Sequence, residues 1–350
     1  MKIQIGKITA SSDNPIVLAE AGVNHNGSLL KAEKLIKTAA RGGAKIVKFQ
    51  TYKASKLVTR KSPRFWKWSG EKKKYGSQFD TYSTLDSFNV EQYSILKKMC
   101  DKYKVEFMST PFDDESAIML NRLGMKAFKV ASCDITNYPL LKTISKFNKP
   151  ILLSTGASDI SEIKETVKFL ESQNVKKLCI MHCILSYPTK LENANLKAIL
   201  DIKRNFPNYL LGLSDHTLGI ETAVSSIMYD VAIIEKHYTY NKNLKKSADH
   251  WLSLNEKEIN QLVNRIKIQK IIKGTESKKR LKCEKITHKF ARRSLVAKYD
   301  LPEGHKITYD DMIPKRPGTG ISPKYFEKLI GKKLKVKVKE DELFNFKKFY

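Results

Sequence analysis

Short apolar runs alternate with amphipathic segments of helical length from about residue 16 to residue 272. Apolar runs of this length predict buried strands, and apolar positions three or four residues apart in the intervening segments predict helices. Eight such units are present, with strands expected at 16–22, 44–50, 105–112, 127–132, 150–156, 178–183, 210–216 and 232–240. Eight strand–helix units within this length predict an α/β fold, the (β/α)8 TIM barrel.

The pattern changes after the eighth helix. Residues 276–291 are polar and predict a linker, and new short segments with turn signals at 302–304 and 316–318 follow. We therefore expect a barrel domain over residues 1–275, a linker over 276–291 and a small domain over 292–350. The stretch 53–89 is too long for a simple loop and is expected to lie over the barrel mouth.

The chain carries 65 Lys and Arg against 36 Asp and Glu over 350 residues, a formal net charge of +29. A surface of this charge attracts polyanions, so nucleic-acid binding is one alternative interpretation. Most lysines, however, lie on the polar faces of amphipathic segments, and the sequence has neither an aromatic RNA-binding strand motif nor zinc-finger spacing. We therefore do not expect nucleic acid to be the main partner, and the same charge would draw in a phosphorylated substrate.

Neither a membrane span nor an export signal is expected. No stretch approaches the roughly 20 apolar residues that cross a bilayer, and the N-terminus lacks an apolar core followed by a cleavage site. The five cysteines are an odd number without paired CxxC blocks, a pattern typical of reduced thiols. We expect a cytoplasmic protein.

Candidate reactive groups lie where the expected strands end, because the active sites of such barrels gather at the carboxyl ends of the strands. All eight runs end in polar residues. Side chains alternate along a strand, so Lys48 and Gln50 share one face, and the apolar residues between them share the face toward the helices. Inward lysines and hydroxyls suit phosphate and carboxylate groups and predict a small polyanionic ligand. These candidates are Lys48, Thr110, Lys129, Ser132, Ser154 and Ser214.

Two histidines are candidate metal ligands. By the same alternation Ser214 and His216 point together, as do Glu235 and His237, which places two imidazoles on neighbouring strands at the barrel mouth. Two imidazoles with water and substrate oxygens make an open site for a divalent ion, with Mn²⁺ first and Mg²⁺ or Co²⁺ as alternatives. Hydrogen bonding at the rim is the alternative role for the pair, and for His182 the two interpretations weigh equally. A buried lysine could instead form a Schiff base, which makes an aldolase the rival enzyme.

Eight sequence blocks carry a family resemblance, and in chain order they are AEAGVNHNGS, KIVKFQTY, STPFD, KVAS, LSTG, HCILSYPT, LSDHT and IEKH. Together they resemble the sialic acid synthases. RRSLVAKYDLPEGHKIT and KRPGTGISP resemble the antifreeze-like (SAF) domain of that family, so the resemblance covers essentially the whole chain. It implies a domain-swapped homodimer whose small domain reaches the partner subunit's active site.

The resemblance also implies the reaction, which joins phosphoenolpyruvate to an N-acetylmannosamine-type amino sugar and gives a nine-carbon 2-keto acid. The third carbon of phosphoenolpyruvate attacks the sugar aldehyde, water adds at the second carbon, and phosphate leaves by carbon–oxygen cleavage. A metal at His216 and His237 would polarise the aldehyde, and Glu20 would handle a proton or stabilise the cation. The residues implied to hold phosphoenolpyruvate are Lys48, Thr110, Lys129, Ser132, Ser154 and Ser214.

Sugar contacts are implied for Gln50, Asp134, Tyr187, Asp249 and, from the small domain, Arg316. Two positions depart from the family pattern. Asp134 stands where N-acetylneuraminate-forming members have glutamate, and Leu185 stands where some members have asparagine. Synthases of legionaminic and pseudaminic acids, which use diacetamido hexoses, are therefore alternatives within the same family.

Overall fold

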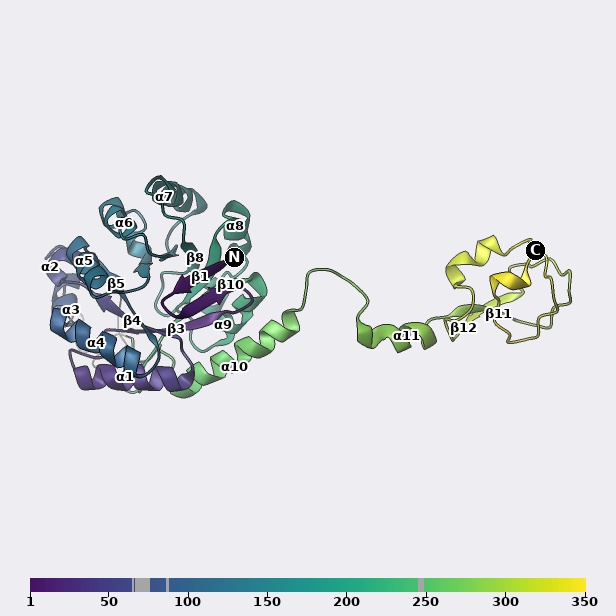
Figure 1. The fold of residues 1–350 in the computed structure, drawn as a ribbon, viewed down its shortest axis with the longest axis horizontal. Coiled ribbons are helices and arrows are strands. Elements are labelled where there is room, and N and C mark those ends of the chain that lie inside the picture. The colour runs from purple at the N-terminus through teal and green to yellow at the C-terminus, as the bar shows by residue number, and fades with distance from the viewer. Residues whose placement is uncertain (65, 67–75, 86–87, 245–248) are drawn as a thin grey trace. The chain divides into compact units, whose positions relative to one another are not determined.

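The computed structural model describes residues 1–64, 66, 76–85, 88–244 and 249–350. The chain divides into two compact units, Met1–Gly274 and Thr275–Tyr350, and each has its own buried apolar core. Figure 1 labels many of the elements of both units. The expected linker, residues 276–291, belongs to the second unit.

The first unit is built on an eight-stranded parallel sheet. Hydrogen bonds connect its strands in the order β5-β4-β3-β10-β9-β8-β7-β6, and the end strands β5 and β6 pack against each other, which brings the sheet round into a barrel. The predicted (β/α)8 fold is thereby confirmed. The strands are β3 (Ile16–Gly22), β4 (Ile46–Thr51), β5 (Glu106–Pro111), β6 (Phe128–Val130), β7 (Ile151–Ser154), β8 (Leu178–Cys183), β9 (Leu210–Asp215) and β10 (Val231–His237).

Helices alternate with these strands and surround the sheet (Figure 1). Local sequence sets where they begin. Before the helix that starts at Ile160, the Asp159 carboxylate accepts from the backbone N–H groups of Ser161 and Glu162, and the Glu162 carboxylate accepts from the backbone N–H of Asp159. The helices that follow the eight strands in turn are α1 (Leu29–Gly42), α4 (Val90–Lys102), α5 (Asp114–Arg122), α6 (Tyr138–Ser145), α7 (Ile160–Ser172), α8 (Ala198–Asn205), α9 (Glu221–Ser225) and α10 (Glu256–Lys273).

The long insertion 53–89 contains α2 (Ala54–Leu57) and α3 (Gln78–Leu85). Residues 65, 67–75 and 86–87 of this insertion, Trp68 among them, lie outside the described residues, so its expected place over the barrel mouth stays a prediction. Among the described helices, none combines the length and the apolar composition needed to cross a bilayer.

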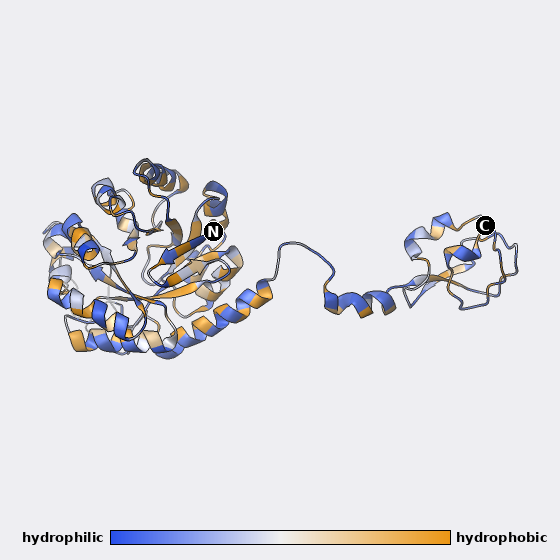
Figure 2. Ribbon diagram, viewed as in Figure 1, coloured by the Kyte–Doolittle hydropathy of each residue, from blue (hydrophilic) through white to orange (hydrophobic). Residues whose placement is uncertain are grey.

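The core of the first unit lies inside the barrel and between the sheet and its helices, where Figure 2 shows the hydrophobic colouring of the strands against helices with hydrophilic outer faces. A hairpin that the sequence analysis did not find, β1 (Lys2–Ile5) and β2 (Ile8–Ser11), adds Ile3, Ile5 and Ala10 to this core. β2 packs against β10. Both strands of the hairpin are only four residues long; burial alternates along β1 but not along β2.

The second unit pairs β11 (Ser294–Ala297) with β12 (Met312–Lys315) in antiparallel register. Its small core includes Leu295, Ile307 and Phe344. The other elements are η4 (Lys282–Glu284), α11 (Lys285–Phe290), η5 (Pro323–Lys328) and η6 (Phe346–Lys348). The expected linker thus contains η4 and α11.

Candidate active site

One buried ammonium, on β4, contacts side chains from three other strands on the inner face of the barrel. Lys48 of β4 places Nζ 2.6 Å from Oε2 of Glu20 on β3 and 3.7 Å from Oε1 of Glu235 on β10. The same Nζ donates to Oγ1 of Thr110 on β5 at 2.9 Å. The hydroxyl of Ser214 on β9 donates to the same Glu235 Oε1 at 3.2 Å. All five side chains are buried, so these charges act in a poorly solvated environment.

Burial and the neighbouring charges shift the pKa values of Glu20 and Lys48. Desolvation is the largest influence on Glu20 and, with the charge of Glu235, raises its pKa to about 7 against the opposing attraction of Lys48. For Lys48 burial works the other way, but the attraction of the two carboxylates prevails and raises its pKa. Lys48 is therefore charged at pH 7, whereas Glu20 can gain or lose a proton near that pH.

A second buried lysine lies on β6, the last strand in the hydrogen-bonded order. Lys129 of β6 donates from Nζ to Ser154 Oγ at 2.6 Å and to the Val130 carbonyl at 3.0 Å, and burial lowers its pKa. Ser132 accepts from the backbone N–H of Gly156 at 2.9 Å. A Cβ at Gly156 would lie only 2.8 Å from Ser132 Oγ, so the chain needs glycine there. The predicted phosphate-binding side chains Lys129, Ser132 and Ser154 are thus buried and lie close together.

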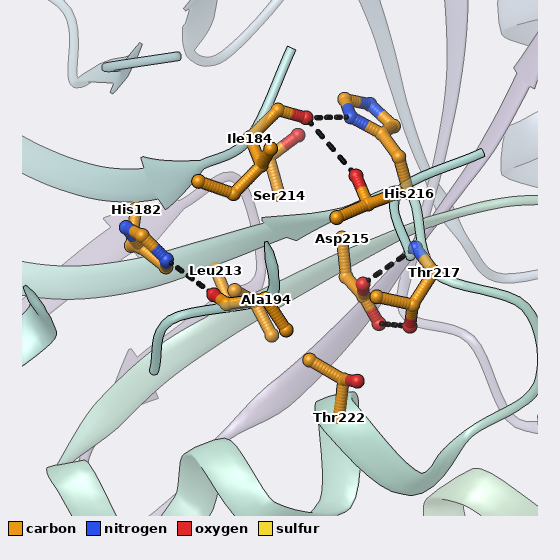
Figure 3. A pocket seen from close by; sticks show the side chains of 10 residues that line it. His182, Ile184, Ala194, Leu213, Ser214, Asp215, His216, Thr217 and Thr222 are labelled. Atoms are coloured by element: carbon orange, nitrogen blue, oxygen red, sulfur yellow. Dashed lines mark hydrogen bonds between the residues drawn. The ribbon is translucent and has the colours of Figure 1, made fainter. Parts of the chain in front are cut away.

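The two candidate metal ligands lie side by side, with ring centroids 5.4 Å apart. The Nδ1 of His216 is 2.9 Å from the Ile184 carbonyl, as Figure 3 shows, so this nitrogen carries the proton and Nε2 keeps its lone pair. The Nδ1 of His237 lies 3.6 Å from Asp249 Oδ2 and has no hydrogen-bond partner among the described residues. Burial lowers the pKa of His237 well below its usual value, which keeps this imidazole neutral and able to bind a cation.

The donor set fits an open metal site. Among the described residues, no group of three or more His, Cys, Asp and Glu side chains is arranged to hold a metal. The protein would therefore supply His216 and His237, and water or substrate oxygens would complete the coordination. At His216 a proton would compete with the metal ion, because the pKa of this residue is raised. Burial lowers this pKa, but the Cys183 sulfur 3.9 Å away favours the charged ring and prevails.

Most of the predicted sugar contacts surround the same mouth. Gln50 donates to Glu20 Oε1 at 3.0 Å, and the Tyr187 ring lies 4.1 Å from the His216 ring and 5.8 Å from the His237 ring. Asp134 follows Ser132 by two residues, and its carboxylate accepts from Asn137 Nδ2 at 3.0 Å. Burial raises the pKa of Asp134. Its carboxylate is thus partly engaged within the protein.

Arg316 lies in the second unit, on a loop held by Ser294. The buried Ser294 hydroxyl donates to the Pro317 carbonyl at 2.6 Å and accepts from the Gly320 N–H at 2.8 Å. A Cβ at Gly320 would lie 2.7 Å from the Phe344 carbonyl oxygen, so the close approach of the two segments requires glycine. The loop that presents this guanidinium is therefore well braced.

The outer side of the same strand ends has a structural role. His182 places Nε2 2.9 Å from the Ala194 carbonyl, and this bond favours the interpretation of His182 as a rim hydrogen-bonding residue. In Figure 3 the His216 ring and the Asp215 carboxylate extend to opposite sides of the chain, and Asp215 binds Thr217. The small cavity drawn there is lined by residues from both sides of β9, among them the site residues Ser214 and His216.

The sequence analysis assigned no role to Glu235 or Cys183, although the structure places both beside assigned residues. Glu235 could have been found, because it shares a strand face with His237. Cys183 carried no comparable signal, since its approach to His216 depends on how β8 and β9 pair.

Known proteins resemble this chain along most of its length. The NeuB family model matches residues 35–278 and the SAF domain model matches residues 292–349. N,N'-diacetyllegionaminic acid synthase of Campylobacter jejuni is 39% identical over 94% of this chain and 98% of its own length. Human N-acetylneuraminate-9-phosphate synthase is 29% identical over 93% of this chain and 90% of its own.

A crystal structure of N-acetylneuraminic acid (sialic acid) synthetase from Leptospira borgpetersenii superposes with a TM-score of 0.72 at 31% identity, covering 82% of this chain and 95% of that chain. The family model matches more than half of the chain, and the fold agrees with that of the Leptospira structure. The chain therefore belongs to the NeuB family.

Proposed function

We propose that the chain is a sugar-acid synthase that joins phosphoenolpyruvate to an N-acyl amino sugar and releases phosphate. One observation carries this proposal: two buried lysines with serine and threonine hydroxyls lie at the same strand ends as a pair of buried imidazoles. Ammonium and hydroxyl donors suit a phosphorylated carboxylate, and the imidazoles suit an electrophilic ion beside it.

Each group has a proposed task in this reaction. Lys129, Ser132 and Ser154 bind the phosphate of phosphoenolpyruvate, and the ammonium of Lys129 stabilises the charge that grows as phosphate leaves. Lys48 with Thr110 and Ser214 completes the anion site. Glu20, whose pKa burial raises to about 7, exchanges a proton with the reacting carbons or stabilises positive charge on them.

We propose a divalent ion at His216 and His237, with Mn²⁺ foremost and Mg²⁺ or Co²⁺ as alternatives. When bound, such an ion polarises the aldehyde oxygen of the sugar. The hydrogen bond from His216 to the Ile184 carbonyl orients the first ring, and the Asp249 carboxylate lies beside the second. We place this reaction in the cytoplasm, where phosphoenolpyruvate is made.

A diacetamido deoxyhexose is the acceptor that we favour, and N-acetylmannosamine is the alternative. The synthase of N,N'-diacetyllegionaminic acid shares more identity with this chain than the human N-acetylneuraminate-9-phosphate enzyme, 39% against 29%. Leu185, which is 37% exposed and follows the end of β8 by two residues, lies beside Gly156, the residue whose N–H donates to Ser132. An apolar contact suits a sugar in which hydrogen or methyl replaces a hydroxyl group.

We also propose that the active form is a domain-swapped homodimer in which Arg316 of the SAF domain contacts the N-acyl group in the partner subunit. The family resemblance supports the swap, and the bracing of the Arg316 loop by Ser294 supports the binding role. A guanidinium held on a rigid loop loses less conformational freedom when it binds.

The test is an assay of phosphate release from phosphoenolpyruvate against N-acetylmannosamine and a panel of diacetamido hexoses, with and without a chelator. We expect release that requires sugar, stops after chelation and returns with Mn²⁺. Absence of release with every sugar would overturn the proposal.

A Schiff-base aldolase is the second candidate, favoured by the lowered pKa of the buried Lys129. Borohydride trapping of pyruvate on Lys129 would support that candidate and contradict the synthase. A gel shift of nucleic acid that weakens steeply with salt would instead point to the polyanion-binding alternative.

A further inference from the structure

The segment AGVNHNG at the end of β3 is not explained by the proposed reaction, although it precedes α1 at the barrel mouth. Within it, Asn24 is fully buried. Its carboxamide Nδ2 donates to the Tyr238 carbonyl at 2.9 Å and approaches Ser253 Oγ at 3.4 Å. A carbonyl oxygen can only accept, so this contact determines which end of the carboxamide faces Tyr238.

Tyr238 and Ser253 belong to two parts of the candidate active site. Tyr238 directly follows the metal ligand His237. Ser253 lies in the loop before α10, where its hydroxyl donates to the Asp249 carbonyl and its N–H donates to the same oxygen at 3.1 Å. Asn24 is therefore the junction between the end of β10 and the segment that carries Asp249.

Further contacts couple the same two segments. The N–H of Leu254 donates to the His237 carbonyl at 2.8 Å, and the N–H of Tyr238 donates to the Glu20 carbonyl at 2.7 Å. The site residues Glu20, His237 and Asp249 are thus linked through backbone groups around Asn24. Loss of the carboxamide would leave a buried carbonyl without its donor, a state that folded proteins avoid.

We propose that Asn24 is a positioning residue that holds segment 249–254 against the end of β10 and so presents Asp249 to the sugar. This inference rests on the proposed function for the identity of the ligand. It assigns a role to a residue that touches neither the sugar nor the metal ligands' imidazoles.

The experiment compares Asn24→Ala and Asn24→Asp with Asn255→Ala in the full-length protein. Asp has the shape of Asn but cannot donate to Tyr238 when ionised, so both Asn24 variants should behave alike at a pH where the new carboxyl is ionised, whereas a protonated Asp would restore the donor at lower pH. Asn255 is the matched control, because it lies in the same loop but its side chain caps α10 by accepting from the Glu258 N–H at 3.0 Å.

We expect the Asn24 variants to raise the KM for the sugar about tenfold, the size typical of outer-shell changes, and the KM for phosphoenolpyruvate no more than about twofold. Amide hydrogen exchange within 249–254 should accelerate selectively, and Mn²⁺ titrated without substrates should bind more weakly. Asn255→Ala should show neither the KM change nor the faster exchange within 249–254. Equal changes in both KM values, or an unchanged sugar KM, would overturn the proposal.

A second variant covers the case in which the Asn24 variants do not fold. Ser253→Ala removes the hydroxyl that Asn24 contacts and that donates to the Asp249 carbonyl, but leaves the backbone bond of residue 253 to that carbonyl and the bond from Asn24 to Tyr238. It should therefore raise the sugar KM while Mn²⁺ affinity stays constant. An unchanged sugar KM in a folded Ser253→Ala protein would contradict the coupling. If the wild type releases no phosphate with any sugar, the proposed function fails, and the positioning role is then decided by amide exchange and Mn²⁺ affinity alone.

Discussion

Two lysines of the barrel rim are buried beside carboxylates, but one group is complete and the other is not. On the outer side, Lys236 donates to Asp215 Oδ2 at 3.0 Å and to the Thr217 carbonyl at 2.6 Å. On the inner side, Lys48 is shared between Glu20 and Glu235, and Glu235 Oε2 has no hydrogen-bond partner among the described residues. A group that is complete without a ligand stabilises the fold, whereas an incomplete group can bind one.

The difference between the two lysine groups arises because neighbouring residues of a strand face opposite sides of the sheet. On β10, Glu235 and His237 face inward while Lys236 between them faces outward, and Asp215 alternates in the same way with Ser214 on β9. The Asp215 carboxylate is further satisfied by the N–H and hydroxyl of Thr217. The same two strands therefore provide a structural ion pair on one face and candidate catalytic groups on the other.

The largest expected effect separates inner from outer histidines. His216→Ala or His237→Ala should lower metal-dependent phosphate release on the order of 1,000-fold or more, because several kcal/mol of charge stabilisation is lost. His182→Ala, the outer control, should lose only stability, by about 1–3 kcal/mol, since it leaves the Ala194 carbonyl without a donor. Full activity of both inner variants after exhaustive chelation would contradict the metal assignment.

Next in size is the exchange of each lysine for methionine. Lys236→Met should lower the free energy of unfolding by about 3–5 kcal/mol, because it leaves the buried Asp215 charge unpaired. Lys48→Met should cost less stability, because Glu20, whose pKa burial raises to about 7, can take up a proton. Its loss should appear in phosphate release instead. Urea unfolding of both variants measures the contrast, and equal destabilisation would show that the two groups do not differ as described.

A smaller effect concerns the second inner lysine. Lys129→Ala should raise the KM for phosphoenolpyruvate about thirtyfold, corresponding to roughly 2 kcal/mol for a charge-assisted contact with phosphate. The KM for the sugar should change far less. Steady-state kinetics with each substrate varied in turn checks this, and an equal rise in both values would argue against phosphate binding by Lys129.

The smallest expected effect tests whether Arg316 of the partner subunit contributes to the site. Arg316→Ala and His237→Ala are each expected to be inactive, but a heterodimer would pair one intact barrel with one intact arginine. After subunit exchange at equal amounts, up to about a quarter of wild-type activity should return, because half of the dimers are mixed and each has one working site. No recovery despite demonstrated exchange would contradict either the swap or the role of Arg316.

Much of the fold could be predicted because buried parallel strands have a strong local pattern. The expected strands at 16–22 and 178–183 coincide with β3 and β8, and the others differ at their ends by a few residues. Alternation along single strands also indicated that Lys48, His216 and His237 face the barrel interior. These features depend only on residues that are close in sequence.

Local periodicity was enough to predict the buried strands, their polar ends and the side chains that share a face. The partners of these side chains could not be predicted from it. The shared position of Lys48 between Glu20 and Glu235, the bond of His182 to Ala194 and the junction at Asn24 each join residues from separate strands and loops. Their geometry follows from strand register and from the closing of the sheet into a barrel, which bring distant segments to within hydrogen-bond distance.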